Sequence, residues 1–507
     1  MLKLVLGASG SGKTTLLYAR IRARAETGKR SILLVPEQFT SSTEARIYRE
    51  LGDALSGMVE SFSFTSLAEH ILAALGGAAV QTLTDAGRAV LVRRALEELQ
   101  DNVHYYYRHR RSAAFCQMAA ETIDELKSAG LSGQQLQELA RDCGSESAKL
   151  GELALIFQGY ESLLAGTGMD PADRLELAAD RLEAALARDE LPDFLREREV
   201  FIDEFDTFNA PKKRLMGAML AALPAVTVAL CEDGAPMQPG DLELFSGAKQ
   251  VAAQLRQLAR KNGAQVAAPE LLRRDLRHKD APGLAALTEL LETGSCTPPE
   301  SAPELRLFAA ASREEEARCA AAAIRRLMRQ GVRCGKIAVV CRDISLYRAA
   351  VRYEFRMAEI PLYCDEPTTP EFSAPATAVR ALLALLRGAD MTEQLTVLAT
   401  TGRCDLSEPV GCALDNYAYT WSPNAAAWRA EFTKSPRGFG DAELTEEDTQ
   451  NLTRAENARK KLVMAVDTLR SKVRSANAEQ ISRALYFCLK EVGAEGQQAA
   501  QVEDIRT

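Results

Sequence analysis

The chain has 507 residues and a net charge of −8, with 47% hydrophobic and 26% charged residues, which is the composition of a soluble globular protein of three or four domains. No apolar run reaches the roughly 18 residues that a membrane-spanning helix needs, and the negative charge argues against a generally basic nucleic-acid-binding protein, although not against a local basic groove. The eleven cysteines include no C-x-x-C pair and the four histidines are dispersed, so spacing predicts no zinc or iron–sulfur site.

The first fifteen residues carry a phosphate-binding pattern. Residues 2–6 (LKLVL) have strand character, and residues 7–14 (GASGSGKT) fit G-x-x-x-x-G-K-[ST]. Glycines let backbone N–H groups converge on phosphate oxygens, and a helix that begins at Thr14 favours an anion at its N-terminus. Lys13 would reach the β- and γ-phosphates of ATP, and the Thr14 hydroxyl would hold Mg²⁺. The predicted set in this loop is Gly7, Gly10, Ser11, Gly12, Lys13, Thr14 and Thr15. The alternative is a glycine-rich turn that binds nothing.

Strand and helix signals alternate after this loop. The expected elements are a strand at 31–35, a helix at 42–51, a strand at 58–63 and a helix at 65–75. This alternation predicts a doubly wound parallel sheet, and we assign residues 1–84 to the first part of a RecA-like domain. From 85 to 187, apolar residues recur at helical spacing, which predicts an all-helical insertion.

The sheet resumes at residues 199–202, an apolar strand that ends in Asp203 and Glu204. Such an acidic pair is typical of a Walker B motif, in which Asp203 binds Mg²⁺ through water and Glu204 polarises the attacking water. The alternative is an acid that caps the next helix. Residues 226–230 predict one more core strand, and residues 188–300 complete the first RecA-like domain.

A linker is expected at residues 280–303, which are rich in glycine, serine and proline near their end. After it, strands at 305–308 and 336–341 flank a helix whose N-terminus is capped by Ser312. Residues 301–371 are therefore predicted to start a second RecA-like domain, with Arg342 at the carboxyl end of its second strand.

Residues 372–507 are predicted to be a helical insertion in that second domain. The chain ends inside helical sequence without a stop signal, so we expect it to be cut short or to be part of a longer protein. The fold class predicted for the whole chain is α/β, with P-loop (RecA-like) parallel sheets and large all-helical insertions.

Two α/β units that each carry a helical insertion resemble the layout of UvrD-like superfamily 1 helicases. Residues 202–207 (IDEFDT) resemble the helicase DEFQDT box, and residues 61–68 (SFSFTSLA) resemble a TFHSLA stretch that contacts single-stranded DNA. Residues 337–342 (IAVVCR) resemble the box whose arginine, here Arg342, faces the nucleotide across the domain cleft. A narrower likeness to the AddB (RexB-like) family runs in order through residues 34–40, 62–64, 125–127, 342–343, 360–361, Asp365-Glu366 and 414–417 with Trp428.

The AddB resemblance implies one of the two subunits of the bacterial ATP-dependent helicase/deoxyribonuclease, a cytoplasmic complex that processes DNA double-strand breaks for homologous recombination. It implies an AddA-like partner in a heterodimer, duplex ends and single-stranded DNA as substrates, and recognition of a short hotspot sequence. By resemblance, the emerging strand is lined by Gln38, Thr40, Phe62 and Phe64, whose amide and hydroxyl can pair with base edges and whose rings can stack. The family's nuclease site and iron–sulfur cysteines have no counterpart among these residues.

Two departures leave two functions open. Relatives often have Asp-Gly where this chain has Asp203 and Glu204, so hydrolysis is favoured here. The expected Gly-Asp-x-x-Gln coupling motif is instead CEDG at residues 231–234, which favours a role without motor activity. The chain is thus either an ATP-hydrolysing subunit, in which Lys13, Asp203 and Glu204 are catalytic, or a DNA-reading scaffold with a structural nucleotide site. A P-loop small-molecule kinase is a distant third.

Three weaker signals have alternatives. Residues 105–111 (YYYRHRR) have the composition of a single-strand stacking platform, but a solvated segment with tyrosines packed on a core is the favoured interpretation. Trp421 and Trp428 are expected on one face of one helix, as core or interface anchors. Arg342 could instead form a surface pair with Asp343.

Overall fold

The computed structural model describes residues 1–99, 101–235, 244–364, 373–401, 404–440 and 443–492. The chain divides into two compact units, Met1–Leu307 and Phe308–Thr507. The Asp365-Glu366 pair and the chain end at 503–507, both used in the sequence predictions, lie outside the described residues. None of the described helices combines the length and the apolar character that crossing a membrane requires.

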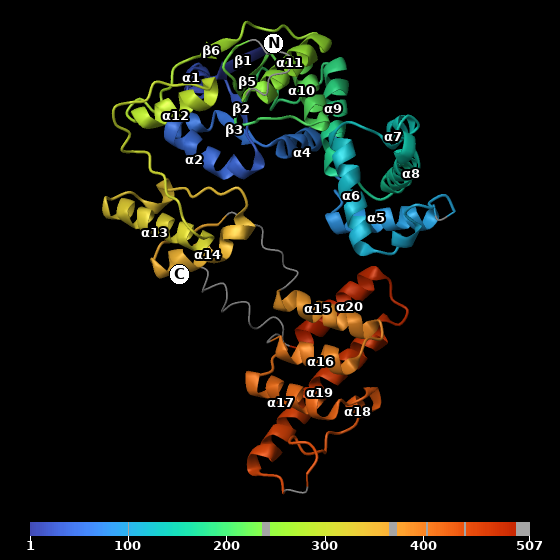
Figure 1. The fold of residues 1–507 in the computed structure, drawn as a ribbon. Helices are drawn as coiled ribbons and strands as arrows, with labels where there is room; N and C mark the ends of the chain where they lie inside the picture. The colour runs from blue at the N-terminus through green and yellow to red at the C-terminus, as the bar shows by residue number, and fades with distance from the viewer. Residues whose placement is uncertain (100, 236–243, 365–372, 402–403, 441–442, 493–507) are drawn as a thin grey trace. The chain divides into compact units, whose positions relative to one another are not determined.

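The described part of the first unit contains a six-stranded sheet in which every neighbouring pair of strands is parallel. The strand order is β3-β2-β4-β5-β1-β6, and Figure 1 shows the sheet with helices around it. The parallel α/β class is confirmed, and the first five strands match the predicted ones. The strands are β1 (Leu2–Gly7), β2 (Ser31–Leu34), β3 (Val59–Phe62), β4 (Glu199–Ile202), β5 (Ala225–Cys231) and β6 (Glu270–Leu272).

Helices cover both faces of this sheet because its strands are apolar on both faces. Along β1, Leu4 and Leu6 enter one core, whereas Val5 between them enters the other. The core that contains Val5 packs against α1 (Lys13–Glu26) and α2 (Thr40–Leu51). The opposite core packs against α4 (Phe64–Leu75), α9 (Pro171–Ala187), α10 (Ala210–Ala222) and α11 (Ser246–Lys261). The short α3 (Asp53–Ser56) precedes β3, and α12 (Pro282–Thr293) follows β6.

The region between α4 and β4 is helical, as predicted. It contains α5 (Asp85–Glu98), α6 (Ala113–Ser128), α7 (Gly133–Ala140) and α8 (Ser147–Leu164), ahead of α9. These helices share a core of their own that includes Leu96, Ile123 and Phe157. Because α5–α8 bury their apolar faces against one another, this insertion forms a compact part of the first unit.

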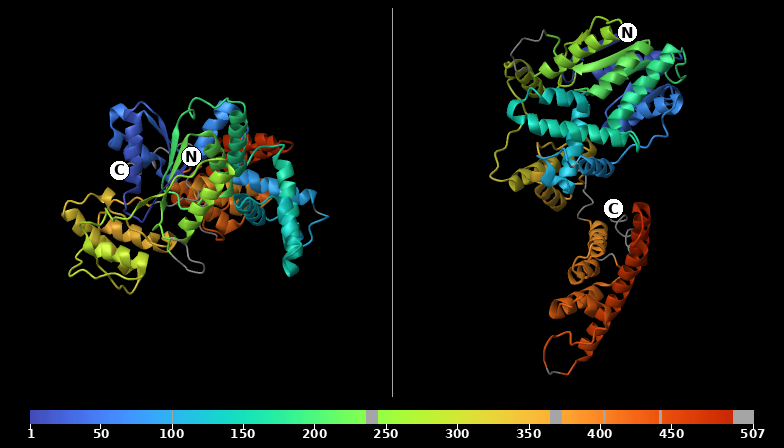
Figure 2. Two further views of the ribbon diagram at one scale, coloured as in Figure 1. Left: turned by 90° about the horizontal axis from the view of Figure 1, so that it is seen from above. Right: turned by 90° about the vertical axis from the view of Figure 1, so that its right-hand side faces the viewer.

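The second unit is helical throughout its described elements. Helices α13 (Arg313–Arg329) and α14 (Ile344–Met357) pack around Ile324 and Phe355, and the Ser312 hydroxyl caps α13 by accepting from the N–H of Glu315. A larger core includes Trp428, which is fully buried. Figure 2 gives two further views of its helices, which are α15 (Ala374–Leu386), α16 (Met391–Thr400), α17 (Glu408–Trp421), α18 (Ala425–Arg429), α19 (Glu446–Val473) and α20 (Ala478–Glu491).

Two predicted strands and one predicted helix differ from the structure, as does part of the predicted linker. The segments 305–308 and 336–341 are not strands, and Leu307 and Val340 are 99% and 89% exposed. An apolar run becomes a strand only when a neighbour completes its hydrogen bonds, and no described strand lies beside these two. Trp421 and Trp428 lie on different helices, α17 and α18, since Ser422 ends α17 with a positive φ of 38°. Helix α12 also occupies part of the predicted linker.

Candidate functional site

The residues that follow β1 and β4 meet at one edge of the sheet. Gly7, the last residue of β1, lies opposite Cys231 of β5, and Ile202 of β4 lies opposite Val228 of the same strand. Because all these strands are parallel, the chain leaves each of them at the same edge. A cavity of about 450 Å³ lies there, and the predicted residues that line it are Gly10, Gly12, Lys13, Thr14, Thr15, Asp203 and Glu204. Gly7 and Ser11 are buried at the base of the same loop.

The loop between β1 and α1 depends on glycine. Gly10 and Gly12 have φ values of 80° and 92°, a region that strains residues with a side chain. A Cβ atom on Gly10 would also lie 2.9 Å from Asp275 Oδ1 and from Arg277 Cβ. The loop backbone therefore packs closely against the segment that follows β6.

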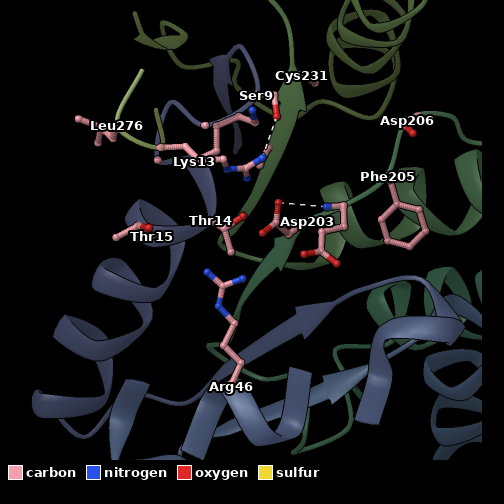
Figure 3. A pocket seen from close by; sticks show the side chains of 15 residues that line it. Ser9, Lys13, Thr14, Thr15, Arg46, Asp203, Phe205, Asp206, Cys231 and Leu276 are labelled. Atoms are coloured by element: carbon pink, nitrogen blue, oxygen red, sulfur yellow. Dashed lines mark hydrogen bonds between the residues drawn. The ribbon is translucent and has the colours of Figure 1, made fainter. Parts of the chain in front are cut away.

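Lys13 and Thr14 begin α1 and face this cavity. Lys13 Nζ donates to the carbonyl oxygens of Gly7 at 2.7 Å and Ala8 at 2.8 Å. Burial lowers the pKa of Lys13, while the negative charge of Asp203 acts in the opposite direction. Figure 3 shows the Thr14 side chain pointing toward Asp203 across the cavity. A cation and a hydroxyl thus face a carboxylate from the end of a different strand.

The two acids after β4 differ in their surroundings. Asp203 is buried, and its Oδ1 accepts a hydrogen bond of 3.0 Å from the N–H of Glu204. The Glu204 side chain lies at the mouth of the cavity, and its backbone has a φ of 65°. Partial burial raises the pKa of Glu204, and the neighbouring charge of Asp203 raises it further. Asp203 is suited to binding a cation, and Glu204 to accepting a proton.

The donor set fits a magnesium–nucleotide complex. No group of three or more His, Cys, Asp and Glu side chains that could hold a metal ion occurs among the described residues. Mg²⁺ usually takes one or two protein oxygens and completes its shell with water and phosphate, so Thr14 and Asp203 are a sufficient protein contribution. Ser11 Oγ is buried and has no hydrogen-bond partner within the described part of the chain, which leaves a polar group available in the loop.

Two arginines at this site were not predicted. Arg46 of α2 lines the cavity, and its guanidinium points toward Thr14 and Asp203 while lying 4.9 Å from the centre of the Tyr18 ring. Arg277 follows β6 and donates to Ser9 Oγ at 3.2 Å. The sequence places Arg46 on the helix after the second strand, but it does not show that this helix reaches the site. Arg277 had no usable signal, because β6 itself was not predicted.

The residues predicted to contact DNA occupy two different environments. Gln38 is exposed, and Thr40 at the start of α2 is half-buried, with its hydroxyl donating to Glu37 O at 2.8 Å. Phe62 and Phe64 are buried, and the Phe64 ring lies 5.3 Å from the centre of the Phe205 ring. Stacking on a base would therefore require the two phenylalanine rings to leave the core.

Arg342 lies in the second unit, where its side chain is exposed. Its neighbour Asp343 caps α14 by accepting from the N–H of Ser345 at 2.9 Å and from its hydroxyl at 2.7 Å. The proposed approach of Arg342 to the nucleotide stays a prediction.

Comparison with known proteins identifies the family. The family described as ADDB, N-terminal, matches residues 4–288, which is more than half of the chain. The chain belongs to the AddB family. Relatives named as a subunit of an ATP-dependent helicase/deoxyribonuclease include those of Desulforudis audaxviator, 34% identical over 72% of this chain and 32% of the relative, and Moorella thermoacetica, 33% identical over 72% and 32%. The Clostridium perfringens relative is 26% identical over 92% of this chain and 41% of its own length. The matched part of the chain thus spans about a third to two fifths of these AddB relatives.

Proposed function

We propose that this chain is an ATP-binding, RecA-like part of AddB, working in a helicase–nuclease complex that processes DNA double-strand breaks. The observation that carries the proposal is that Lys13 and Thr14, at the start of α1, line one cavity with Asp203 and Glu204, which follow β4. A P-loop and a Walker B pair must meet in this way to handle MgATP, although they are far apart in the sequence.

MgATP, when bound, would supply the phosphoryl group that is transferred to water. Lys13 would neutralise phosphate charge. To do so, its ammonium group would give up its hydrogen bonds to the carbonyl oxygens of Gly7 and Ala8 and donate to phosphate oxygens instead. Thr14 and Asp203 would hold the metal. Glu204 would hold the proton released by the attacking water, and its raised pKa, caused by burial and the charge of Asp203, makes it a stronger base.

The names of the relatives support the rest of the assignment. Those names describe one subunit of an ATP-dependent helicase/deoxyribonuclease, which implies a second subunit and DNA as substrate. We propose an AddA-like partner, duplex ends and single-stranded DNA as ligands, hotspot recognition along Gln38 and Thr40, and a cytoplasmic location.

A second candidate, a DNA-binding scaffold with a structural nucleotide site, is favoured by the segment after β5. Cys231 lines the ATP cavity, but the next residue, Glu232, lines a separate cavity of about 550 Å³ beside α11. Asp233 is paired with Lys249 at 3.0 Å. Glu232 and Asp233 thus lie outside the nucleotide cavity, which would weaken the link between hydrolysis and DNA movement.

DNA-stimulated ATPase of the purified chain separates these two candidates. The assays would compare the unchanged chain with Lys13→Ala and Glu204→Gln, with the exposed Lys29→Ala as a matched control. Hydrolysis that DNA stimulates and that both site variants lose supports the ATP-hydrolysing subunit. Nucleotide binding without hydrolysis, together with undiminished DNA binding by Lys13→Ala, supports the scaffold. Measurable ATPase activity that is equal in all four proteins would contradict the proposed site.

A further inference from the structure

A row of aromatic rings lies in the helical insertion, in the loop between α5 and α6 and in the first turn of α6. The Tyr106 ring lies 5.1 Å from Phe115, centre to centre, with 33° between their planes, and His109 lies 5.8 Å from Phe115 at 34°. Tyr105 meets Tyr106 edge-on at 4.9 Å. These four residues line a cavity of about 810 Å³. Phe115 is buried in the core of the insertion, so the row is anchored at its inner end.

The loop that carries these rings is held in place from α8. The carboxylate of Glu152 accepts hydrogen bonds from three successive backbone N–H groups, those of His104 at 2.8 Å, Tyr105 at 2.7 Å and Tyr106 at 3.1 Å. Charge-assisted bonds of this kind are stronger than neutral ones. The row of rings is therefore preorganised, which lowers the entropy cost of binding a ligand against it.

The outer end of the row is open to solvent, and Arg108 and Lys149 line the cavity there. Tyr105 is 59% exposed, and Arg108, which lines the same cavity, is also exposed. Lys149 lines the cavity from α8, where it forms an ion pair of 3.6 Å with Glu146. The interpretation favoured from the sequence, tyrosines packed on a core, describes Tyr106 but not Tyr105.

We propose that this cavity binds single-stranded DNA, with a base stacked on Tyr105 and a flanking phosphate bound by Arg108. An exposed aromatic ring beside cations is the combination that recognises a strand without reading its sequence, because every base has a flat face and every linkage has a negative charge. The inference rests on the proposed function for the identity of the ligand as DNA. It does not depend on ATP, because none of its residues lines the nucleotide cavity.

The test uses the 507-residue chain and a short oligothymidylate that carries one central 2-aminopurine, whose fluorescence falls when it stacks on an aromatic ring. The variants are Tyr105→Ala, Tyr105→Phe and, as a matched control, Tyr419→Ala, whose side chain is 89% exposed on α17. We expect Tyr105→Ala to weaken binding about tenfold and to restore fluorescence, as for the loss of one base–aromatic stack. Tyr105→Phe and Tyr419→Ala should stay within about twofold of the unchanged chain, because each keeps the ring at 105.

A second measurement addresses the charges. Arg108→Ala should lower the slope of log affinity against log salt by about 0.7, the value for one lost phosphate contact on a single strand. Thermal unfolding of each variant checks that the insertion is intact, and the exposed positions of Tyr105 and Arg108 predict unchanged melting.

The proposal is overturned if the chain does not bind the oligomer, if Tyr105→Ala binds as tightly as the unchanged chain, or if an abasic oligomer of equal length binds equally well. The Lys13→Ala variant distinguishes failure of the proposed stacking site from failure of the proposed ATP site. Loss of ATP binding in Lys13→Ala, with DNA binding unaffected by Tyr105→Ala, would overturn the stacking site and leave the ATP site standing.

Discussion

Glu204 combines a chemically useful side chain with a strained backbone. Its φ of 65° is one that glycine adopts without cost, whereas a residue with a Cβ loses about 1–2 kcal/mol there. The position is occupied by a carboxylate beside Asp203, at the mouth of the cavity that contains Lys13. A strained backbone of this kind is found at residues whose function requires the side chain at that position.

We predict that Glu204→Gly stabilises the fold by about 0.5–1 kcal/mol, since the relief of strain exceeds the entropy cost of glycine. The same change removes the proton acceptor, so ATPase activity should fall. Urea unfolding and ATPase assays measure the two effects. Glu204→Gln is the control, because it removes the charge and keeps the strain. A destabilised Glu204→Gly protein with full ATPase activity would contradict this view of the residue.

Arg46 brings a second cation to the cavity from α2, opposite the loop that holds Lys13. We predict that Arg46→Ala weakens ATP binding about tenfold, which corresponds to one charge-assisted hydrogen bond, and weakens ADP binding less. Titration with the two nucleotides measures the ratio. Arg49→Ala on the same helix is the control, because Arg49 lines the neighbouring cavity but not this one. Equal losses for ATP and ADP would place Arg46 away from the terminal phosphate.

At the scale of elements, Glu199 connects three strands and a helix. Its buried carboxylate accepts from Lys3 of β1 at 2.9 Å and Thr227 of β5 at 2.8 Å, and it pairs with Arg24 of α1 at 3.2 Å. Burial acts to raise the pKa of Glu199, but the hydrogen bonds from Lys3 and Thr227 outweigh it, so the pKa lies below its usual value.

We predict that Glu199→Ala destabilises the first unit by about 2 kcal/mol at pH 7, less than for a fully buried pair because Lys3 and Arg24 are partly exposed. An acid whose pKa is lower in the folded than in the unfolded state stabilises the fold at pH values above its unfolded-state pKa. This stabilisation is lost as the pH falls through the folded-state pKa. The variant should therefore lose less stability than the unchanged chain between pH 5 and about pH 3. Urea unfolding across this range measures it, with Glu26→Ala as an exposed control. If the free energy of unfolding changed with pH in the same way in Glu199→Ala and in the unchanged chain, the role of Glu199 would be contradicted.

The sequence predicts the elements whose signals are local. Strands β1–β5 are apolar runs bounded by turns, and the P-loop pattern places Lys13 and Thr14 at the start of α1. The position of Asp203 and Glu204 next to this loop is also predictable, because parallel strands end at the same edge of a sheet. Strand β6 is only three residues long, and these residues form a strand because they pair with Val5 to Gly7 of β1. The segments 305–308 and 336–341 show the converse, since they are apolar enough but have no described neighbour. Arg46 and Arg277 depend on where α2 and the segment after β6 cross the site, which no local pattern encodes.

At the scale of the whole molecule, the two units have separate cores. The sheet and the helical insertion belong to residues 1–307, and the core around Trp428 belongs to residues 308–507. Units that bury their apolar surface independently can unfold independently, and a ligand stabilises only the unit that binds it.

We therefore predict two resolved transitions in scanning calorimetry. MgATP at about 100 times its Kd should stabilise the unit that contains Lys13 by about 2.7 kcal/mol and leave the other unchanged. Trp428→Ala should lower only the other transition, because it removes a buried ring that packs on Phe432 at 5.4 Å. One transition that responds to both changes would show that the two units unfold together.

Calorimetric titration of the chain with MgATP measures whether the loop after β1 and the acids after β4 form one MgATP site. We predict one binding site, at least tenfold weaker binding for Lys13→Ala and for Asp203→Asn, unchanged binding for Lys29→Ala, and weaker binding when EDTA removes Mg²⁺. Absence of binding by the unchanged chain, or equal affinity in Lys13→Ala, would contradict the account.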